Sequence, residues 1–328
     1  MVYVQRHFEK FHKAIRLSLD ENQTLREKRR IVCSKIVDRL PRIFAEVGEE
    51  CPPFEICDQG SYQMRTGTYP LNGDFDIDLG MYFAIDPDEV HPVDLKRLVH
   101  GALVGHTREV RIRRPCVTVQ YQQAGEPSYH VDIAIYADGS QSRDRLPRLA
   151  IGKGRSGEKF CGWEISDPLA LSAIILDSYE GEELRQFRRI VRYLKRWKDV
   201  RFHPRGNAAP RGIALTVAAH QHFEWGSFRD GTPDDLGALT NVVDGILESF
   251  TVRPLWWLFS QPSHEIQINL PVAPHSNLCE RMTPRHMKRF HAELEALLGV
   301  LDLVRRGRSE ERACERLRSV FGDDFPSA

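Results

Sequence analysis

The chain has no long hydrophobic run and no excess of one charge, and each absence narrows what it can be. No apolar stretch approaches the roughly eighteen residues of a membrane-spanning helix, and the N-terminal residues lack the apolar region of a signal peptide. Lys plus Arg equals Asp plus Glu at 46 each, so no net charge draws the chain to nucleic acid. We therefore expect neither a membrane nor an obligatory nucleic-acid partner.

Cysteine motifs are also missing. The seven cysteines are odd in number, scattered, and free of Cys-x-x-Cys spacing. This usage favours reduced thiols in a cytoplasm over a disulfide framework or a structural zinc. With 328 residues, 41% of them hydrophobic, the chain is long enough for two lobes with separate cores.

What the chain does contain is a Gly-Ser step followed by acidic residues that alternate into an apolar segment. Gly60 and Ser61 offer backbone N–H groups and a hydroxyl, which suit the phosphates of a nucleoside triphosphate. Asp76 and Asp78 share one face if they lie in a strand, about 6.6 Å apart along the chain, so both carboxylates can reach the same cation.

A third acid, Asp132, lies inside a second apolar segment. A charge in that setting is costly to bury unless it is paired or metal-bound, so we interpret Asp132 as the further ligand of a two-metal phosphoryl-transfer site. Each part alone is weak evidence, because Gly-Ser is a common turn and acidic alternation usually marks an exposed strand face. Asp74 is an alternative member of the pair, but it follows turn residues, so we prefer Asp76 with Asp78.

Periodicity predicts a sheet region between helical regions. Helices are expected over 3–19 and from the Asp20-Glu21-Asn22 cap to Pro41, and the helical second half begins at Asp167-Pro168. Strands are expected at 54–57, 77–85, 110–112, 116–121 and 131–136, with a helix over 91–104. Later helices are expected at 169–179, 182–199, 213–223, 236–250, 284–304 and 310–321.

The remaining segments are expected to be irregular or solvent-facing. Residues 137–160 are expected to be a surface linker, or else a basic lid over a phosphate, and residues 253–276 a loop. Most charges on the basic helix 185–198 are expected to form a solvated face. The tail after Phe321 has a helix-stopping glycine and a proline, so it should be exposed and mobile.

In this order the motifs resemble the cGAS/DncV-like nucleotidyltransferases, which bacteria use to make cyclic oligonucleotide signals in anti-phage defence. The resemblance rests on Gln59-Gly60-Ser61-Tyr62, on the stretch from Asp76 to Tyr82 and on the stretch from Val131 to Ala137. It spans about residues 5–325. It implies an α+β, polymerase-β-like fold with N-terminal helices bridging the lobes (1–50), a catalytic sheet lobe (51–160) and a helical nucleotide-clamping lobe (161–328).

The resemblance also implies a reaction and its participants. Asp76, Asp78 and Asp132 would be catalytic and would bind two Mg²⁺ or Mn²⁺ ions, and nucleoside triphosphates such as ATP and GTP would be joined into a cyclic product. The nucleotide-binding residues would be Gln59, Gly60, Ser61, Lys195 and Arg211. Arg211-Gly212 replaces the Ser pair of the family, whose hydroxyl binds phosphate.

Other interpretations stay open. A nucleotidyltransferase that makes linear oligoadenylate, adds tails to RNA or modifies antibiotics would share the acids, and a non-catalytic nucleotide sensor is the non-enzyme alternative. The C-terminus is either a frayed end or, as the resemblance implies for some relatives, the site where an E1/E2-like ligase joins Ala328 to a target.

Overall fold

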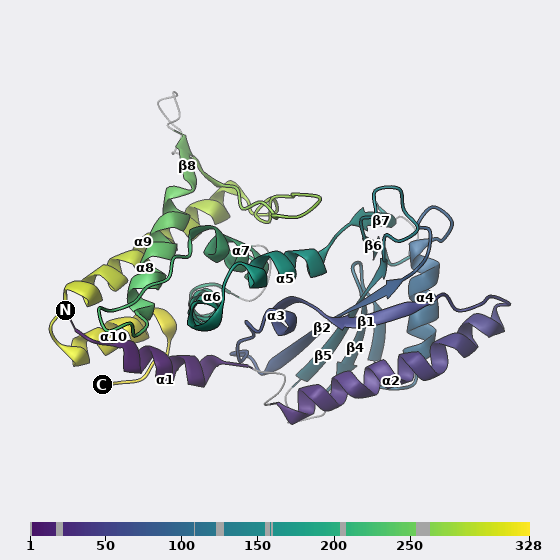
Figure 1. Ribbon diagram of the computed structural model, residues 1–328, viewed down its shortest axis with the longest axis horizontal. Coiled ribbons are helices and arrows are strands. Elements are labelled where there is room, and N and C mark those ends of the chain that lie inside the picture. Colours follow the sequence, from purple (N-terminus) through teal and green to yellow (C-terminus); the bar gives the residue numbers. More distant parts are fainter. Residues whose placement is uncertain are drawn as a thin grey trace.

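The computed structural model describes residues 2–17, 22–107, 109–122, 128–154, 158, 160–203, 208–253 and 263–328. They form a sheet lobe and a helical lobe side by side (Figure 1). The helices are α1 (Gln5–Ile15), α2 (Gln23–Glu46), α3 (Gly60–Gln63), α4 (Pro92–Leu103), α5 (Pro168–Asp177), α6 (Gly181–Arg201), α7 (Gly212–His222), α8 (Asp235–Glu248), α9 (Pro284–Arg306) and α10 (Glu310–Phe321). The strands are β1 (Phe54–Asp58), β2 (Asp74–Phe83), β3 (Glu109–Ile112), β4 (Val117–Tyr121), β5 (Ser128–Ala137), β6 (Arg148–Ile151), β7 (Gly162–Ile165), β8 (Phe250–Arg253) and β9 (Ser263–Ile266).

The sheet brings the two acidic strands together. Its order is β1-β2-β5-β4-β3, with β6 paired to β5 and β7 to β6. β2 and β5 run parallel, whereas β1 and β4 pair antiparallel with them. Ile77 and Leu79 point from β2 into a core that includes Val32 and Ile36 of α2 and Val99 of α4. The alternate residues of β2 therefore lie on the other face, away from these helices.

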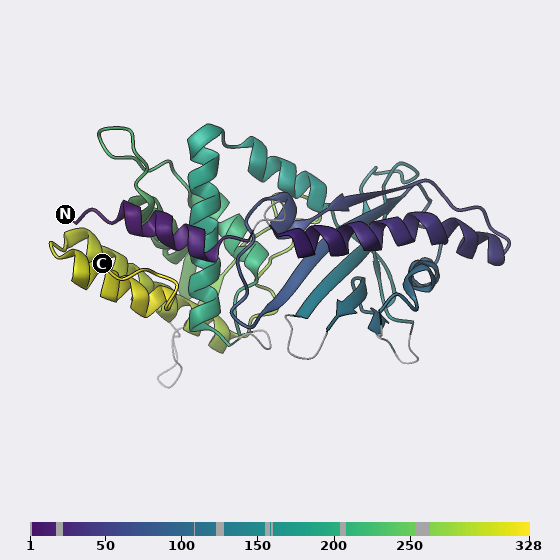
Figure 2. The same cartoon turned by 90° about the horizontal axis from the view of Figure 1, so that it is seen from below.

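The helical lobe is built around α6, the long teal helix that Figure 2 shows along its length. Phe187, Tyr193 and Trp197 of α6 are fully buried in a core shared with α7, α8, α9 and α10. Asp235 at the start of α8 is also fully buried and pairs with Arg189 of α6 at 2.8 Å. Such a charge is stable inside a protein only because its partner and hydrogen bonds replace water.

The first two helices pack in different lobes. Phe8 and Phe11 of α1 are buried in the helical-lobe core, whereas Leu25 and Leu40 of α2 are buried in the sheet-lobe core. As expected, Asn22 caps α2, because its side chain accepts a hydrogen bond from the Leu25 N–H. The N-terminal segment thus contacts both lobes.

Several predicted boundaries differ from the structure. α2 continues past Pro41 to Glu46, and Phe44 in this last turn is buried in the sheet-lobe core, so tertiary packing outweighs the helix-breaking tendency of proline. β2 begins at Asp74, so Asp74 belongs to the strand and not to the turn. Asp167 caps α5 and Pro168 occupies its first turn, as predicted.

Two segments predicted to be irregular contain strands. β6 lies within the expected linker 137–160, where Ala150 and Ile151 are buried, and β9 lies within the expected loop 253–276. Both strands are four residues long, which is too short for a periodic signal. The central part of the proposed basic lid, residues 155–157, and residues 254–262 lie outside the described residues.

The C-terminal tail is docked on the helical lobe through Phe325, so the prediction of an exposed tail is wrong for Phe325, whereas Asp323 is exposed. Phe325 is fully buried, with its ring 5.3 Å from that of Phe8 and 5.1 Å from that of Phe11. Arg318 donates a hydrogen bond to the Phe325 carbonyl at 2.7 Å. Local sequence could not reveal this contact, because its partners lie in α1. Beyond Phe325, Ala328 is exposed. The exposed segment available to a ligase is therefore shorter than the tail that we expected.

Two further expectations concern the chain as a whole. All seven cysteines are free thiols. No helix in the described part of the chain is both long enough and apolar enough to cross a membrane.

Candidate active site

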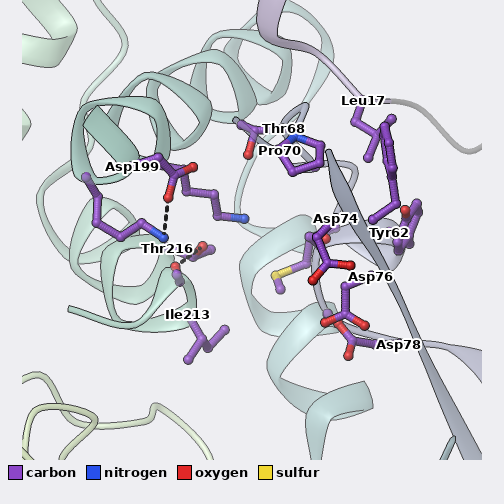
Figure 3. A pocket seen from close by; sticks show the side chains of 18 residues that line it. Leu17, Tyr62, Thr68, Pro70, Asp74, Asp76, Asp78, Asp199, Ile213 and Thr216 are labelled. Carbon is purple, nitrogen blue, oxygen red and sulfur yellow. Dashed lines mark hydrogen bonds and ion pairs between the residues drawn. The ribbon is translucent and has the colours of Figure 1, made fainter. Parts of the chain in front are cut away.

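The acidic residues meet on one face of the sheet because of strand register. Asp76 and Asp78 alternate with the buried Ile77 of β2, so their side chains point to the face away from α2. In the parallel pairing with β5, Asp78 lies directly opposite Asp132, and Asp76 lies opposite His130. The structure therefore brings together the three acids that sequence reasoning selected. Figure 3 shows Asp74, Asp76 and Asp78 in a column along β2.

The carboxylates on this face of the sheet repel one another. Loss of solvation, followed by repulsion from Asp78, Asp132 and Asp74, raises the pKa of Asp76. Loss of solvation and repulsion from Asp132 likewise raise the pKa of Asp78, whereas Lys195 lowers it. Such a cluster attracts a cation, because a positive charge would relieve the repulsion.

Asp132 is held in place by a neighbouring strand. The Thr118 hydroxyl on β4 donates a hydrogen bond to Asp132 Oδ1 at 2.5 Å, and Thr118 lies directly opposite Asp132 in the β4–β5 ladder. This contact orients the Asp132 carboxylate. Sequence reasoning missed Thr118, because only the pairing of β4 with β5 identifies it as the partner.

The donor set fits a hard divalent cation such as Mg²⁺, because its side-chain donors are carboxylate oxygens. Within the described ranges, no three His, Cys, Asp or Glu side chains are arranged so that they alone could hold a metal ion. Protein sites for Mg²⁺ commonly use one or two carboxylates and complete the coordination with substrate phosphates and water. Asp76, Asp78 and Asp132 fit that kind of open site.

Asp74 lies on the same face but has a different partner. Its Oδ1 is 3.3 Å from Nδ1 of His130, the residue that lies opposite Asp76. Asp78 instead faces Asp132 in the ladder. This register favours Asp76 with Asp78 as the metal-binding pair, although Asp74 also lines the cavity.

The Gly-Ser step packs directly against Asp78. Gly60 begins the short helix α3 with φ +59°, a conformation that favours glycine. A Cβ atom at Gly60 would lie 2.8 Å from Asp78 Oδ2, so the missing side chain is what allows the loop to approach the carboxylate. Gln59 is placed differently, because its amide donates to the Tyr82 hydroxyl at 2.6 Å in a buried contact. Gln59 therefore holds the loop against Tyr82 of β2.

A cavity of about 420 Å³ lies between the lobes, and both lobes contribute to its walls. The sheet lobe supplies Gly60, Ser61, Asp76 and Asp78. The helical lobe supplies Lys195, Lys198, Asp199, Gly212, Ile213 and Thr216. In Figure 3 the labelled Asp199, Thr216 and Ile213 lie across the cavity from Asp76 and Asp78. Two predicted nucleotide-binding residues, Gln59 and Arg211, are not among those that line it.

Lys195 lies between the two lobes in this cavity. Its Nζ donates hydrogen bonds to the Thr66 carbonyl at 3.1 Å and to the Thr66 hydroxyl at 3.0 Å. Loss of solvation, with repulsion from Arg192 and Lys198, lowers the pKa of Lys195 to about 7. An anionic ligand would reverse this effect and favour the charged amine. Arg211 instead occupies the N-cap position of α7 and is exposed.

The basic face of α6 is an interface between the lobes, so the prediction that most of its charges are solvated is wrong. Arg192 and Arg196 are 5% and 1% exposed. The side chains of this face donate to backbone carbonyls of the segment between α3 and β2. The contacts are Arg188 Nε to Met64 O (3.1 Å), Arg192 Nε to Gly67 O (3.0 Å), Lys195 Nζ to Thr66 O (3.1 Å) and Arg196 Nη2 to Tyr69 O (2.8 Å). We call this set the α6 clamp.

The α6 clamp fixes the loop that carries the site. The clamped carbonyls lie between Met64 and Tyr69, so α6 holds the segment that joins the Gly-Ser step to the acidic strand. Charge-assisted hydrogen bonds of this kind are stronger than neutral ones. Sequence periodicity could identify the basic face but not its partners, because those partners are backbone carbonyls.

The fold and the site together define a class of protein. A Gly-Ser loop packed on a paired-aspartate strand, a third aspartate on the adjacent strand and a helical lobe across the cavity are features of a polymerase-β-like nucleotidyltransferase. Residues 54–136, which contain all three acids, match the family described as Cyclic GMP-AMP synthase DncV-like, nucleotidyltransferase domain. Residues 54–136 therefore form a DncV-like nucleotidyltransferase domain, as the motifs predict.

Similar proteins agree with this assignment. A cyclic GMP-AMP synthase from Escherichia albertii is 25% identical over 210 residues, which are 59% of this chain and 44% of that protein, so the match spans less than half of the curated relative. The structure of Vibrio cholerae DncV with nonhydrolyzable GTP superposes with a TM-score of 0.72, at 18% identity, over 98% of this chain and 96% of that one.

Two more solved structures extend the likeness of fold. The Vibrio cholerae enzyme in complex with the linear intermediate 5′ pppA(3′,5′)pG gives a TM-score of 0.67 at 17% identity, covering 98% of this chain and 96% of that one. Escherichia coli DncV in its 3′-deoxy GTP bound form gives 0.66 at 18% identity, covering 95% and 93%. Because the match extends over both lobes, the whole described chain has this fold.

Proposed function

We propose that this protein synthesises a cyclic dinucleotide from two nucleoside triphosphates and releases pyrophosphate. The observation that carries the proposal is the convergence of Asp76, Asp78 and Asp132 on one face of the sheet. Asp76 and Asp78 line a cavity between the lobes together with Lys195. Clustered carboxylates that can hold metal ions, with a cation in the same cavity, are the charges that nucleotidyl transfer requires.

Each step joins a ribose hydroxyl oxygen of one nucleotide to the α-phosphorus of the other and breaks the bond between that phosphorus and the oxygen of the leaving pyrophosphate. When bound by the three acids, Mg²⁺ or Mn²⁺ ions would polarise the phosphate and lower the pKa of the attacking hydroxyl. Gly60 and Ser61 would orient the donor triphosphate beside Asp78. The Lys195 amine would offset the negative charge that develops on the leaving group.

We propose ATP and GTP as the substrates. The support comes from relatives: one is a cyclic GMP-AMP synthase, and solved structures of Vibrio cholerae DncV contain nonhydrolyzable GTP and a linear intermediate of A and G. An alternative purine or pyrimidine pair would use the same acids, because the bases do not take part in the chemical step.

The biological setting is a proposal on the same basis. We propose a bacterial anti-phage signalling role, in which the product diffuses to an effector, because the motifs resemble enzymes of that system. We also propose a cytoplasmic location, which the seven free thiols support.

The proposal is tested by pyrophosphate release from pairs of nucleoside triphosphates with Mg²⁺ or Mn²⁺. The unmodified protein should release pyrophosphate from at least one pair, most rapidly from ATP with GTP. Asp76→Asn should remove this activity while the protein keeps its fold, as judged by circular dichroism. Steady release by the Asp76→Asn variant would mean that the acids are not the catalytic centre.

A further inference from the structure

An ion pair lies in the helical-lobe wall of the active-site cavity. Lys198 Nζ is 2.6 Å from Asp199 Oδ1, and the two side chains are 23% and 27% exposed. Adjacent residues of a helix do not face each other, so both side chains must bend to meet. Such a solvent-accessible pair contributes little to stability, typically about 0–1 kcal/mol. Lys198 can therefore exchange its partner at low cost.

This ion pair lies in the cavity that would hold the phosphates of a bound nucleotide. Lys195 precedes Lys198 by three residues, so on a helix the two side chains are neighbours, and both line the cavity. Lys195 is the residue that interacts electrostatically with Asp78. Asp199 lies across the cavity from Asp76 and Asp78 in Figure 3. The α6 wall of the cavity therefore places two lysines in the same cavity as the carboxylates of β2.

The proposed reaction determines where the α-phosphate of the donor nucleotide lies. The α-phosphate must lie beside Asp76 and Asp78, because the bond change occurs there. From there the β- and γ-phosphates can extend across the cavity toward Lys195, Lys198 and Gly212 on the opposite wall. At that end Gly212 lines the cavity but has no side chain to donate a hydrogen bond. The amine of Lys198, which lines the same cavity, can supply a charged donor for the last phosphate.

We propose that Lys198 binds the γ-phosphate of the donor nucleotide and that Lys198 stays paired with Asp199 until the nucleotide binds. This inference rests on the proposed function and adds a determinant of triphosphate selectivity to it. In the free protein Asp199 offsets the repulsion between Lys195 and Lys198. In the complex the phosphate takes over that role, and the Lys198 amine exchanges one anionic partner for another.

The proposal predicts opposite effects for the two members of the ion pair. Affinities are measured for nonhydrolyzable ATP and GTP analogues and for the matching diphosphates, with Mg²⁺ present. Lys198→Met should weaken triphosphate binding about tenfold or more, since a charge-assisted hydrogen bond is lost, and change diphosphate binding less than about twofold. Asp199→Asn should tighten triphosphate binding, because the competing carboxylate charge is gone.

A matched control separates this effect from a general loss of charge on α6. Arg201 near the end of the same helix pairs with Glu293 at 2.7 Å and does not line the cavity, so Arg201→Met should leave both affinities unchanged. If Asp199→Asn weakens triphosphate binding as much as Lys198→Met, the pair is structural and the inference is wrong. Equal loss of triphosphate and diphosphate binding in Lys198→Met would also refute it. If the unmodified protein binds neither analogue, the proposed function itself fails.

Discussion

Replacement of Gly60 by alanine should disable the site without unfolding the protein. At φ +59° an alanine costs roughly 1–2 kcal/mol of folding free energy relative to a residue in an ordinary conformation. Its Cβ would lie 2.8 Å from Asp78 Oδ2, closer than atoms in contact can approach, so the Asp78 carboxylate must move. A displacement of about 1 Å in a catalytic group can lower a rate about 100-fold.

Gly48 provides the matched control. It has φ +81°, and a Cβ atom there would meet no atom within 4 Å. Gly60→Ala and Gly48→Ala should therefore lose similar stability in urea denaturation, about 1–2 kcal/mol each. Only Gly60→Ala should lose pyrophosphate release, by about 100-fold. If Gly60→Ala keeps activity comparable to that of Gly48→Ala, the contact with Asp78 does not position the carboxylate, and the geometry described above is wrong.

Three further substitutions test other parts of the structure. Arg192→Met removes hydrogen bonds to the carbonyls of Gly67 and Arg65, so the denaturant midpoint should fall by the equivalent of about 3 kcal/mol; a loss below about 1 kcal/mol would contradict the α6 clamp. Lys96→Met removes a fully buried amine that donates to the carbonyls of Arg113, Arg114 and Gly152, and it should cost about 3 kcal/mol of stability, with kcat unchanged at low temperature. Asp132→Asn keeps an oxygen that can accept from Thr118, so thermal unfolding should change little while nucleotidyl transfer is lost; an active variant would remove Asp132 from the catalytic set.

Sequence reasoning located the acids because they violate local expectations. Asp132 is a charge inside an apolar strand, and Asp76 and Asp78 are charges just before the apolar part of another strand. Such violations are expected at functional sites. The pairing of Asp78 with Asp132 was not visible in the pattern, because register depends on contacts between strands that are distant in the sequence.

The errors have a common physical cause. Arg192 on the basic face of α6 and Phe325 in the tail both have partners far away in the chain, namely Gly67 and Phe8. A local sequence pattern shows which residues are charged or apolar, but it does not show which residues they contact in the fold. A charged helix was therefore interpreted as solvated and a short tail as exposed. Lys198 was missed as a cavity residue for the same reason.

The most direct test of the central claim is the identity of the product. Purified protein is incubated with ATP, GTP and Mg²⁺, the mixture is treated with alkaline phosphatase, and the remaining nucleotides are identified by mass spectrometry. A cyclic product has no terminal phosphate, so we predict a phosphatase-resistant dinucleotide that is absent when Asp78→Asn is used. Conversion of all products to nucleosides or to linear dinucleotides without a cyclic species would contradict cyclic dinucleotide synthesis.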